Sequence, residues 1–228
     1  MIKVLMFSLI ASVAACSCEK GWGCDVEGGY QFEIPATLSP ALDTFHIGDT
    51  ISIENDFSDQ VYDRQTQQTY SLENFEFYPG TAIIRIDTLS KWGKASLNYA
   101  LDDFQLIIPE QYNYEIFTFG DGSKIATGEF LYANSRYSLQ LKLIPQESGL
   151  FIISHGIGLG SQNSDDRQEF EGKCKDVSIS GIAKLNGGSD NNISFLNNSP
   201  DPHWNDWVLQ KPNERYHHSG AYTFYVVE

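Results

Sequence analysis

Apolar and polar residues alternate along much of this chain, and a period of two restricts it to folds built from half-buried β-strands. The alternation is clearest in the stretch 136–144, where Tyr137, Leu139, Leu141 and Leu143 fall on one side of an extended strand. Further strands are predicted over residues 30–34, 50–54, 81–87, 114–119, 125–132, 150–154 and 221–227. We therefore expect an all-β protein.

Tight turns are predicted where glycine, proline, asparagine and aspartate interrupt these stretches. Pro79-Gly80 predicts a hairpin between 75–77 and 81–87, and the Gly-Asp-Gly-Ser sequence of 120–123 predicts a second one. Short strands separated by such turns are typical of an antiparallel β-sandwich. No internal repeat indicates two copies of one domain.

The C-terminal part is different, because it is rich in loops. Residues 186–199 are dense in asparagine, glycine, aspartate and serine. One short helix is expected after them, with Asp201 as N-cap, Pro202 as first helical residue and Pro212 as the stop. The predicted fold is a β-sandwich with a loop-rich C-terminal segment and one short helix.

The first fifteen residues have the pattern of a signal peptide. Lys3 supplies one positive charge, and an apolar stretch then runs from Val4 to Ala15. That stretch is too short for a transmembrane helix, which needs about 20 apolar residues. The segment ends in Val13-Ala14-Ala15-Cys16, which resembles the lipobox of bacterial lipoproteins.

This resemblance implies that Cys16 is diacylated and becomes the first residue of the mature chain. Two or three acyl chains give stable membrane anchoring. We expect a signal peptide over 1–15, a lipidated tether over 16–29, a sandwich domain over 30–228, and a lipid-anchored location at the outer membrane, on its periplasmic or its surface face. The alternative is an ordinary secretory signal that leaves Cys16 as a free thiol.

Three further cysteines remain, Cys18, Cys24 and Cys174. An odd number cannot pair completely within one chain, and the compartment is oxidising, so one disulfide is expected. A Cys18–Cys24 bond would close a small loop in the tether. A Cys24–Cys174 bond, which we favour, would attach the tether to the domain and stabilise it by ~4 kcal/mol or more.

A second resemblance covers most of the mature chain. The stretches 35–40, 43–51 and 57–63, together with Cys174 and a terminal strand like 220–224, are similar to the uncharacterised lipoproteins of Bacteroidota type. These proteins carry an immunoglobulin-like sandwich, so the resemblance implies that fold here. Its motifs are structural, and it transfers no catalytic residue.

Charge and motifs exclude several functions. A net charge of −15 argues against binding of nucleic acid and against a polybasic membrane patch. The sequence His155-Gly156-Ile157-Gly158-Leu159-Gly160-Ser161 lacks the last glycine of a dinucleotide loop and predicts a turn or bulge. There is no G-x-S-x-G motif. The scattered histidines are interpreted as surface residues, and 187–192 lacks the ligand ladder of a calcium loop. We expect no catalytic residue, cofactor or metal.

The most informative candidate site is an aromatic cluster near the C-terminus. Trp204 and Trp207 are three residues apart and would share one face of the short helix, with Tyr216 nearby. An exposed face would bind a sugar ring or an apolar protein anchor, whereas a buried face would only pack the helix onto the sandwich. We expect a non-catalytic envelope binding or adhesion module with a glycan or protein ligand. The alternatives are a structural or accessory envelope lipoprotein and an enzyme with dispersed catalytic residues.

Overall fold

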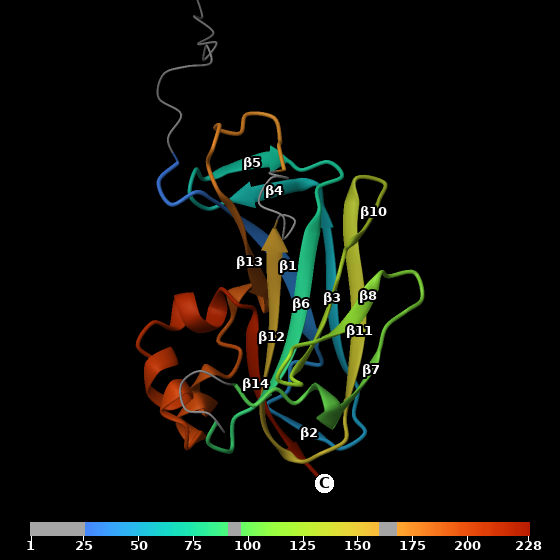
Figure 1. The fold of residues 1–228 in the computed structure, drawn as a ribbon, viewed down its shortest axis with the longest axis vertical. Helices are drawn as coiled ribbons and strands as arrows, with labels where there is room; N and C mark the ends of the chain where they lie inside the picture. The colour runs from blue at the N-terminus through green and yellow to red at the C-terminus, as the bar shows by residue number, and fades with distance from the viewer. Residues whose placement is uncertain (1–25, 91–96, 160–167) are drawn as a thin grey trace, which may run out of the picture.

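Two β-sheets packed face to face form the body of the protein (Figure 1), which confirms the predicted β-sandwich. The structure, a computed structural model, describes residues 26–90, 97–159 and 168–228. The core between the sheets is rich in aromatic rings, and inward-facing residues of both sheets contribute to it.

The first sheet has eight strands in the described part of the chain. Six of them lie in the order β10-β11-β3-β1-β4-β5, while β13 pairs with β1 and β7 pairs with β11. Their bounds are β1 Tyr30–Ser39, β3 Ile51–Ser58, β4 Gln60–Asp63, β5 Gln68–Ser71, β7 Phe104–Ile107, β10 Leu131–Ala133, β11 Arg136–Pro145 and β13 Ile179–Leu185. The β1–β13 pairing is parallel and the others are antiparallel.

The second sheet has six strands among the described residues, in the order β2-β14-β12-β6-β9-β8. Their bounds are β2 Thr44–His46, β6 Phe77–Arg85, β8 Tyr114–Thr118, β9 Lys124–Gly128, β12 Gly149–Leu159 and β14 Ala221–Val227. Only the pairing of β14 with the short β2 is parallel. A further helical turn, η2 (Leu101–Asp103), leads into β7.

Strand β11 is the strand that the alternation predicts best. Tyr137, Leu139, Leu141 and Leu143 are all buried, and β11 pairs with β3 over eight register positions from Arg136 to Leu143. One face of this strand contacts the core, so the period of two survives in the folded structure.

Two predicted turns are wrong, since strands run through both of them. Strand β6 continues across Pro79-Gly80. β9 pairs with β6 only at Gly80 and Thr81, so Pro79 has no partner residue in β9, and a strand position unpaired on one side tolerates the N–H that proline lacks. Strand β12 likewise continues through His155 to Leu159, antiparallel to β6. The glycine-rich stretch that predicted a turn is therefore central strand.

The C-terminal segment forms a third layer on the outer face of the second sheet (Figure 1), as the helical turns beside β12 and β14 show. It packs through a second apolar cluster made of Ile84, Ile86, Leu150, Ile152, Leu196, Trp204, Val208, Tyr216 and Ala221. Its helical turns are η3 Asn186–Gly188, η4 Ile193–Asn198, η5 His203–Val208 and η6 Asn213–His217.

The single predicted helix is therefore replaced by a series of short turns. η5 and η6 are π-helical, each little more than one turn long, and Pro212 precedes η6 instead of ending a longer helix. Asp201 still caps the start of η5, because its Oδ1 accepts the N–H of His203 at 2.9 Å. Its Oδ2 accepts the N–H of Ser90 at 3.0 Å, which ties the segment to the loop after β6.

A buried chain of hydrogen bonds crosses the core between the sheets. His155 of β12 is fully buried, so its interpretation as a surface histidine is wrong. Its Nε2 lies 2.9 Å from Asn55 Oδ1 of β3, and its Nδ1 lies 2.8 Å from the hydroxyl of Thr81. Tyr114 extends the chain to Thr81 at 2.9 Å, and Asn55 donates to the carbonyl of Pro35 at 2.8 Å.

Candidate functional site

The predicted tryptophan face is not formed. Trp204 is only 7% exposed, whereas Trp207 on the same turn is 46% exposed. The prediction assumed an α-helix, in which residues three apart share a face, but a π-helical turn is wound more widely and separates them. Only Trp207 is therefore available to a ligand.

Trp204 and Tyr216 attach the C-terminal segment to the sandwich. Both belong to the apolar cluster on the outer face of the second sheet, and Tyr216 is fully buried. The Tyr216 hydroxyl donates to the carbonyl of Asn191 and lies 2.7 Å from Thr223 Oγ1, while burial raises its pKa. These two residues stabilise the fold, and their burial leaves neither ring exposed to a ligand.

Trp207 contributes to a small exposed cluster with two polar neighbours. The imidazole of His203 stacks on it with ring centroids 4.8 Å apart, and the Arg215 guanidinium lies 3.9 Å from the centre of the ring. Arg215 also donates to the carbonyl of Trp207. Burial lowers the pKa of His203, and Arg215 lowers it further against the opposing effect of Asp201. Trp207 is thus held in place by its own neighbours.

A larger feature that the sequence did not predict is a cleft of about 510 Å³ between residues of 85–89 and 97–103 on one side and the turn of the β8–β9 hairpin on the other. We call it the hairpin cleft. Its lining includes Arg85, Asn98, Tyr99, Asp103, Asp121 and Ser123. The cleft combines one aromatic ring with several hydrogen-bonding side chains.

Further aromatic residues lie beside the hairpin cleft, next to Tyr99, which is the one aromatic residue that lines it. Phe119 lies at the start of the hairpin turn, with its ring centroid 6.2 Å from that of Tyr99 and 5.0 Å from that of Phe117. Ile116, Phe117 and Phe119 are 40–52% exposed, so an apolar patch faces solvent here. The run Ile116-Phe117-x-Phe119 breaks the apolar–polar alternation, and this irregularity was the available sequence signal.

The charges in the hairpin cleft are only partly neutralised. Arg85 forms an ion pair with Asp87 at 2.8 Å and reaches Asp103 at 3.8 Å. Burial raises the pKa of the Asp103 carboxyl, and Arg85 acts in the opposite direction. Asp121 accepts hydrogen bonds from Ser123, at 2.6 Å from the hydroxyl, and these bonds lower the pKa of Asp121.

The Tyr99 hydroxyl stays protonated at neutral pH, because burial and the nearby Asp121 raise its pKa. The cleft offers donors from Arg85 and Tyr99 and acceptors from the carboxylates, while the Asn98 amide already donates to Thr88 and Leu89. Such a mixture suits a ligand with many hydroxyl groups. No cluster of three or more potential metal ligands occurs among the residues that the structure describes.

Of the residues predicted for lipid attachment and disulfide formation, Cys174 is the one that the structure describes. Cys16 and Cys24 lie outside the described residues, so lipidation and the Cys24–Cys174 pairing stay predictions. Cys174 is 5% exposed and disulfide-bonded, and its N–H donates to the Tyr30 hydroxyl at 3.0 Å. No helix over 26–90, 97–159 and 168–228 is both long and apolar enough to cross a membrane.

No known protein family matches the chain, and no curated protein sequence matches it. Solved structures show a distant likeness. The reeler domain of human F-spondin (fragment 2) has a TM-score of 0.33 and 13% identity, covering 70% of this chain and 93% of that chain. A type II cohesin domain from the Acetivibrio cellulolyticus cellulosome has a TM-score of 0.28 and 9% identity, covering 65% and 91%.

The CupB6 tip adhesin from Pseudomonas aeruginosa has a TM-score of 0.20 and 14% identity, covering 70% of this chain and 43% of that chain. A likeness at these TM-scores supports no conclusion about function.

Proposed function

We propose that the protein is a cell-envelope lipoprotein, anchored through Cys16 at the outer membrane, whose sandwich is a non-catalytic module that binds a glycan in the hairpin cleft. The observation that carries this proposal is the exposed Phe119 next to Tyr99, in a cleft that carboxylates, an amide and a guanidinium also line. Sugars present apolar ring faces and hydroxyl edges, and this arrangement provides a partner for each.

The position of the hairpin cleft agrees with a display function. Phe75, just before β6, packs close to Phe32 near the start of β1, with ring centroids 6.4 Å apart. Strand β6 leads away from there to Arg85 at its other end, in the cleft. The Arg85 end of β6, which lines the cleft, and the start of β1 thus lie at opposite ends of the sandwich (Figure 1). A chain tethered before Tyr30 would present the cleft away from the membrane.

A protein ligand is the second candidate, and a different observation favours it. β8 is the last strand in the order of the second sheet, and it carries the exposed Ile116 and Phe117. An edge strand with exposed apolar side chains is a surface on which another polypeptide can pair. The structural or accessory role expected as an alternative has no comparable surface in its favour.

The test is a glycan-array screen of the soluble chain Ser17–Glu228, followed by titration of the best ligand. Phe119→Ala is expected to weaken binding about threefold to tenfold, because a stacked aromatic contact contributes roughly 0.5–1.5 kcal/mol. Leu131→Ala is the matched control, since Leu131 is 41% exposed and Phe119 is 40% exposed. Leu131 lies on β10 of the other sheet, so Leu131→Ala should leave the affinity for the ligand unchanged.

Two results would contradict the site. A loss of binding in Trp207→Ala with normal binding in Phe119→Ala would move the site to the C-terminal segment. A ligand that binds both variants and the parent chain equally would exclude both surfaces.

Membrane anchoring is tested separately with Cys16→Ala, which should release the protein from the membrane fraction. Continued membrane association of this variant would disprove lipidation at Cys16.

A further inference from the structure

A second cavity, distinct from the hairpin cleft, is lined by basic side chains although the chain as a whole carries a net charge of −15. It has a volume of about 170 Å³ and lies where β1, β13 and η6 meet. We call it the basic pocket. The side chains that matter for its chemistry are those of Glu33, Arg64, Lys184, Asn213, His217 and His218.

Arg64 has no carboxylate partner among the described residues. It directly follows β4, and its N–H donates to the carbonyl of Gln31 at 3.1 Å. Its neighbour Asp63 is turned away, because the Asp63 oxygens accept hydrogen bonds from Gln31 and from Thr66. The Arg64 guanidinium instead donates to Nε2 of His218 at 2.6 Å.

His218 does not neutralise this cation. Burial lowers the pKa of His218, and the adjacent Arg64 lowers it further. The imidazole is therefore neutral at pH 7, which agrees with its role as acceptor for Arg64. Arg64 therefore forms no ion pair with a described residue, although the carboxylate of Glu33 lines the same pocket.

Lys184 adds a second cation to the pocket. Its Nζ lies 3.4 Å from a carboxylate oxygen of Glu33, and the side chains of Lys184 and Glu33 are 39% and 23% exposed. An ion pair this long and this accessible to water is weak. Glu33 is the one carboxylate among the residues that line the pocket, so the two cations exceed the anions.

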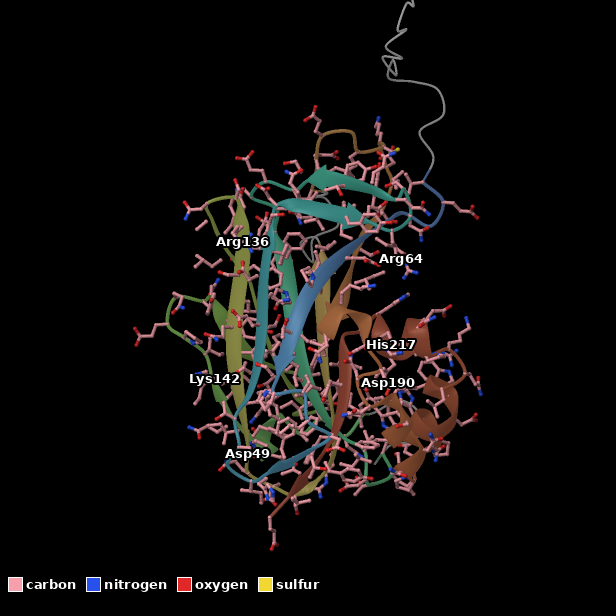
Figure 2. All side chains as sticks on the ribbon, turned by 180° about the vertical axis from the view of Figure 1, so that it is seen from behind. Asp49, Arg64, Arg136, Lys142, Asp190 and His217 are labelled. Atoms are coloured by element: carbon pink, nitrogen blue, oxygen red, sulfur yellow. The ribbon has the colours of Figure 1, made fainter. Side chains whose placement is uncertain are left out.

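His217 provides an unsatisfied polar atom at the same place. Its Nδ1 is buried and has no hydrogen-bond partner in the described part of the chain. A buried ring nitrogen without a partner is costly, and native structures commonly satisfy such atoms with a bound molecule. Figure 2 shows Arg64 and His217 on the same side of the molecule, as two residues that line one pocket.

We propose that the basic pocket binds an oxyanion, namely the phosphate, sulfate or carboxylate group of a small ligand. The Arg64 guanidinium matches the planar spacing of such oxygens, and Lys184 contributes a point charge. This site shares no lining residue with the hairpin cleft, and it does not depend on the function proposed above.

The proposal is tested by calorimetric titration of the full-length protein in detergent at constant ionic strength. Inorganic phosphate and glucuronate are titrated in separate arms, with glucose as the uncharged control. We expect one saturable site for at least one of the two anions and none for glucose. The anion that binds distinguishes a phosphate ligand from an acidic sugar.

Arg64→Gln should weaken this binding about tenfold or more, because a charge-assisted hydrogen bond is worth roughly 1.5–3 kcal/mol. Arg136→Gln is the matched control, because Arg136 also lies on the surface but pairs with Asp56 at 2.6 Å and is far from the pocket (Figure 2). It should change the affinity less than about twofold. Lys184→Gln provides a second test and should also weaken binding.

Three results would overturn the proposal. The first is that neither anion binds. The second is an equal loss of affinity in Arg64→Gln and Arg136→Gln, which would indicate a response to net charge alone. The third is glucuronate binding that is lost in Phe119→Ala and retained in Arg64→Gln. That binding would belong to the hairpin cleft.

Discussion

Lowering the pH from 7 to 5 is expected to destabilise the sandwich through His155. The hydrogen bonds around this residue have one consistent direction: Tyr114 donates to Thr81, Thr81 donates to Nδ1 of His155, and Nε2–H donates to Asn55 Oδ1. Asn55 must present its oxygen, because its amide nitrogen already donates to Pro35. The network therefore holds the neutral imidazole.

The size of the effect follows from the pKa of His155, which burial lowers from 6.5 to about 4. A group whose pKa is lower in the folded state binds fewer protons there, so stability is full above pH 6.5 and is lost as the pH falls toward 4. At pH 5 an unfolded histidine is about 97% protonated and a buried one with this pKa about 10%. The free energy of unfolding falls by about 2 kcal/mol between pH 7 and pH 5, and by about 3 kcal/mol at the acid limit.

Urea unfolding, followed by tryptophan fluorescence at pH 7, 6 and 5, measures this loss. The comparison is with His155→Gln, whose own stability at pH 7 is irrelevant; only its change with pH matters. The parent chain should lose about 2 kcal/mol more than the variant, or about 4–8 °C in Tm for a domain of this size. His46→Gln, which removes an exposed histidine, is the control substitution.

Because burial also lowers the pKa of His203 and His218, both add to the acid sensitivity with the same sign. The difference between the parent and His155→Gln isolates the buried residue. Equal losses in these two proteins would refute the reasoning, as would an NMR titration of His155 with a midpoint near 6.5.

Three further predictions concern stability. Trp204→Ala should cost about 3–5 kcal/mol by leaving a cavity under the C-terminal segment, whereas Trp207→Ala should cost less than about 1 kcal/mol; denaturant midpoints compare them. Cys174→Ser should cost roughly 4–5 kcal/mol if the bond closes the long loop to Cys24, and peptide mapping without reduction identifies the partner; a small loss would exclude this pairing. Gly220→Ala should lower the free energy of unfolding by about 3 kcal/mol, because Gly220 has a φ of +62° and a Cβ there would lie 2.5 Å from the carbonyl oxygen of His155. An unchanged Tm would show that the backbone relaxes.

The alternation of apolar and polar residues predicted strands where one face meets the core and the other meets water. The alternation holds in β11. It does not hold in β12, where the four residues from Leu150 to Ile153 are all buried, or in β14, where those from Ala221 to Phe224 are all buried. β6 shows the same departure at Ile83 and Ile84. A continuous apolar run is typical of a strand covered on both faces, and the covering layer here is the C-terminal segment.

The site was harder to predict, because its parts meet only in the folded chain. The hairpin cleft joins Asn98 and Asp103 to Asp121, and no spacing in a single sequence relates these residues. Trp204 and Trp207 were correctly placed in a short helical segment, but the choice between α- and π-helical winding decides which face each one takes. His155 lies in a glycine-rich stretch whose burial depends on its strand neighbours.

The parallel pairing of β1 with β13 bears on how the domain responds to mechanical load. A chain held before Tyr30 and pulled from the hairpin cleft is stretched along its strands. β1 is joined to β13 through seven register positions, from Tyr30 opposite Ile179 to Ala36 opposite Leu185, and then to β3 from Thr37 to Ser39. A pull in this direction shears these hydrogen bonds together instead of peeling them one at a time, so the first strand after the tether is also the one best placed to resist extraction.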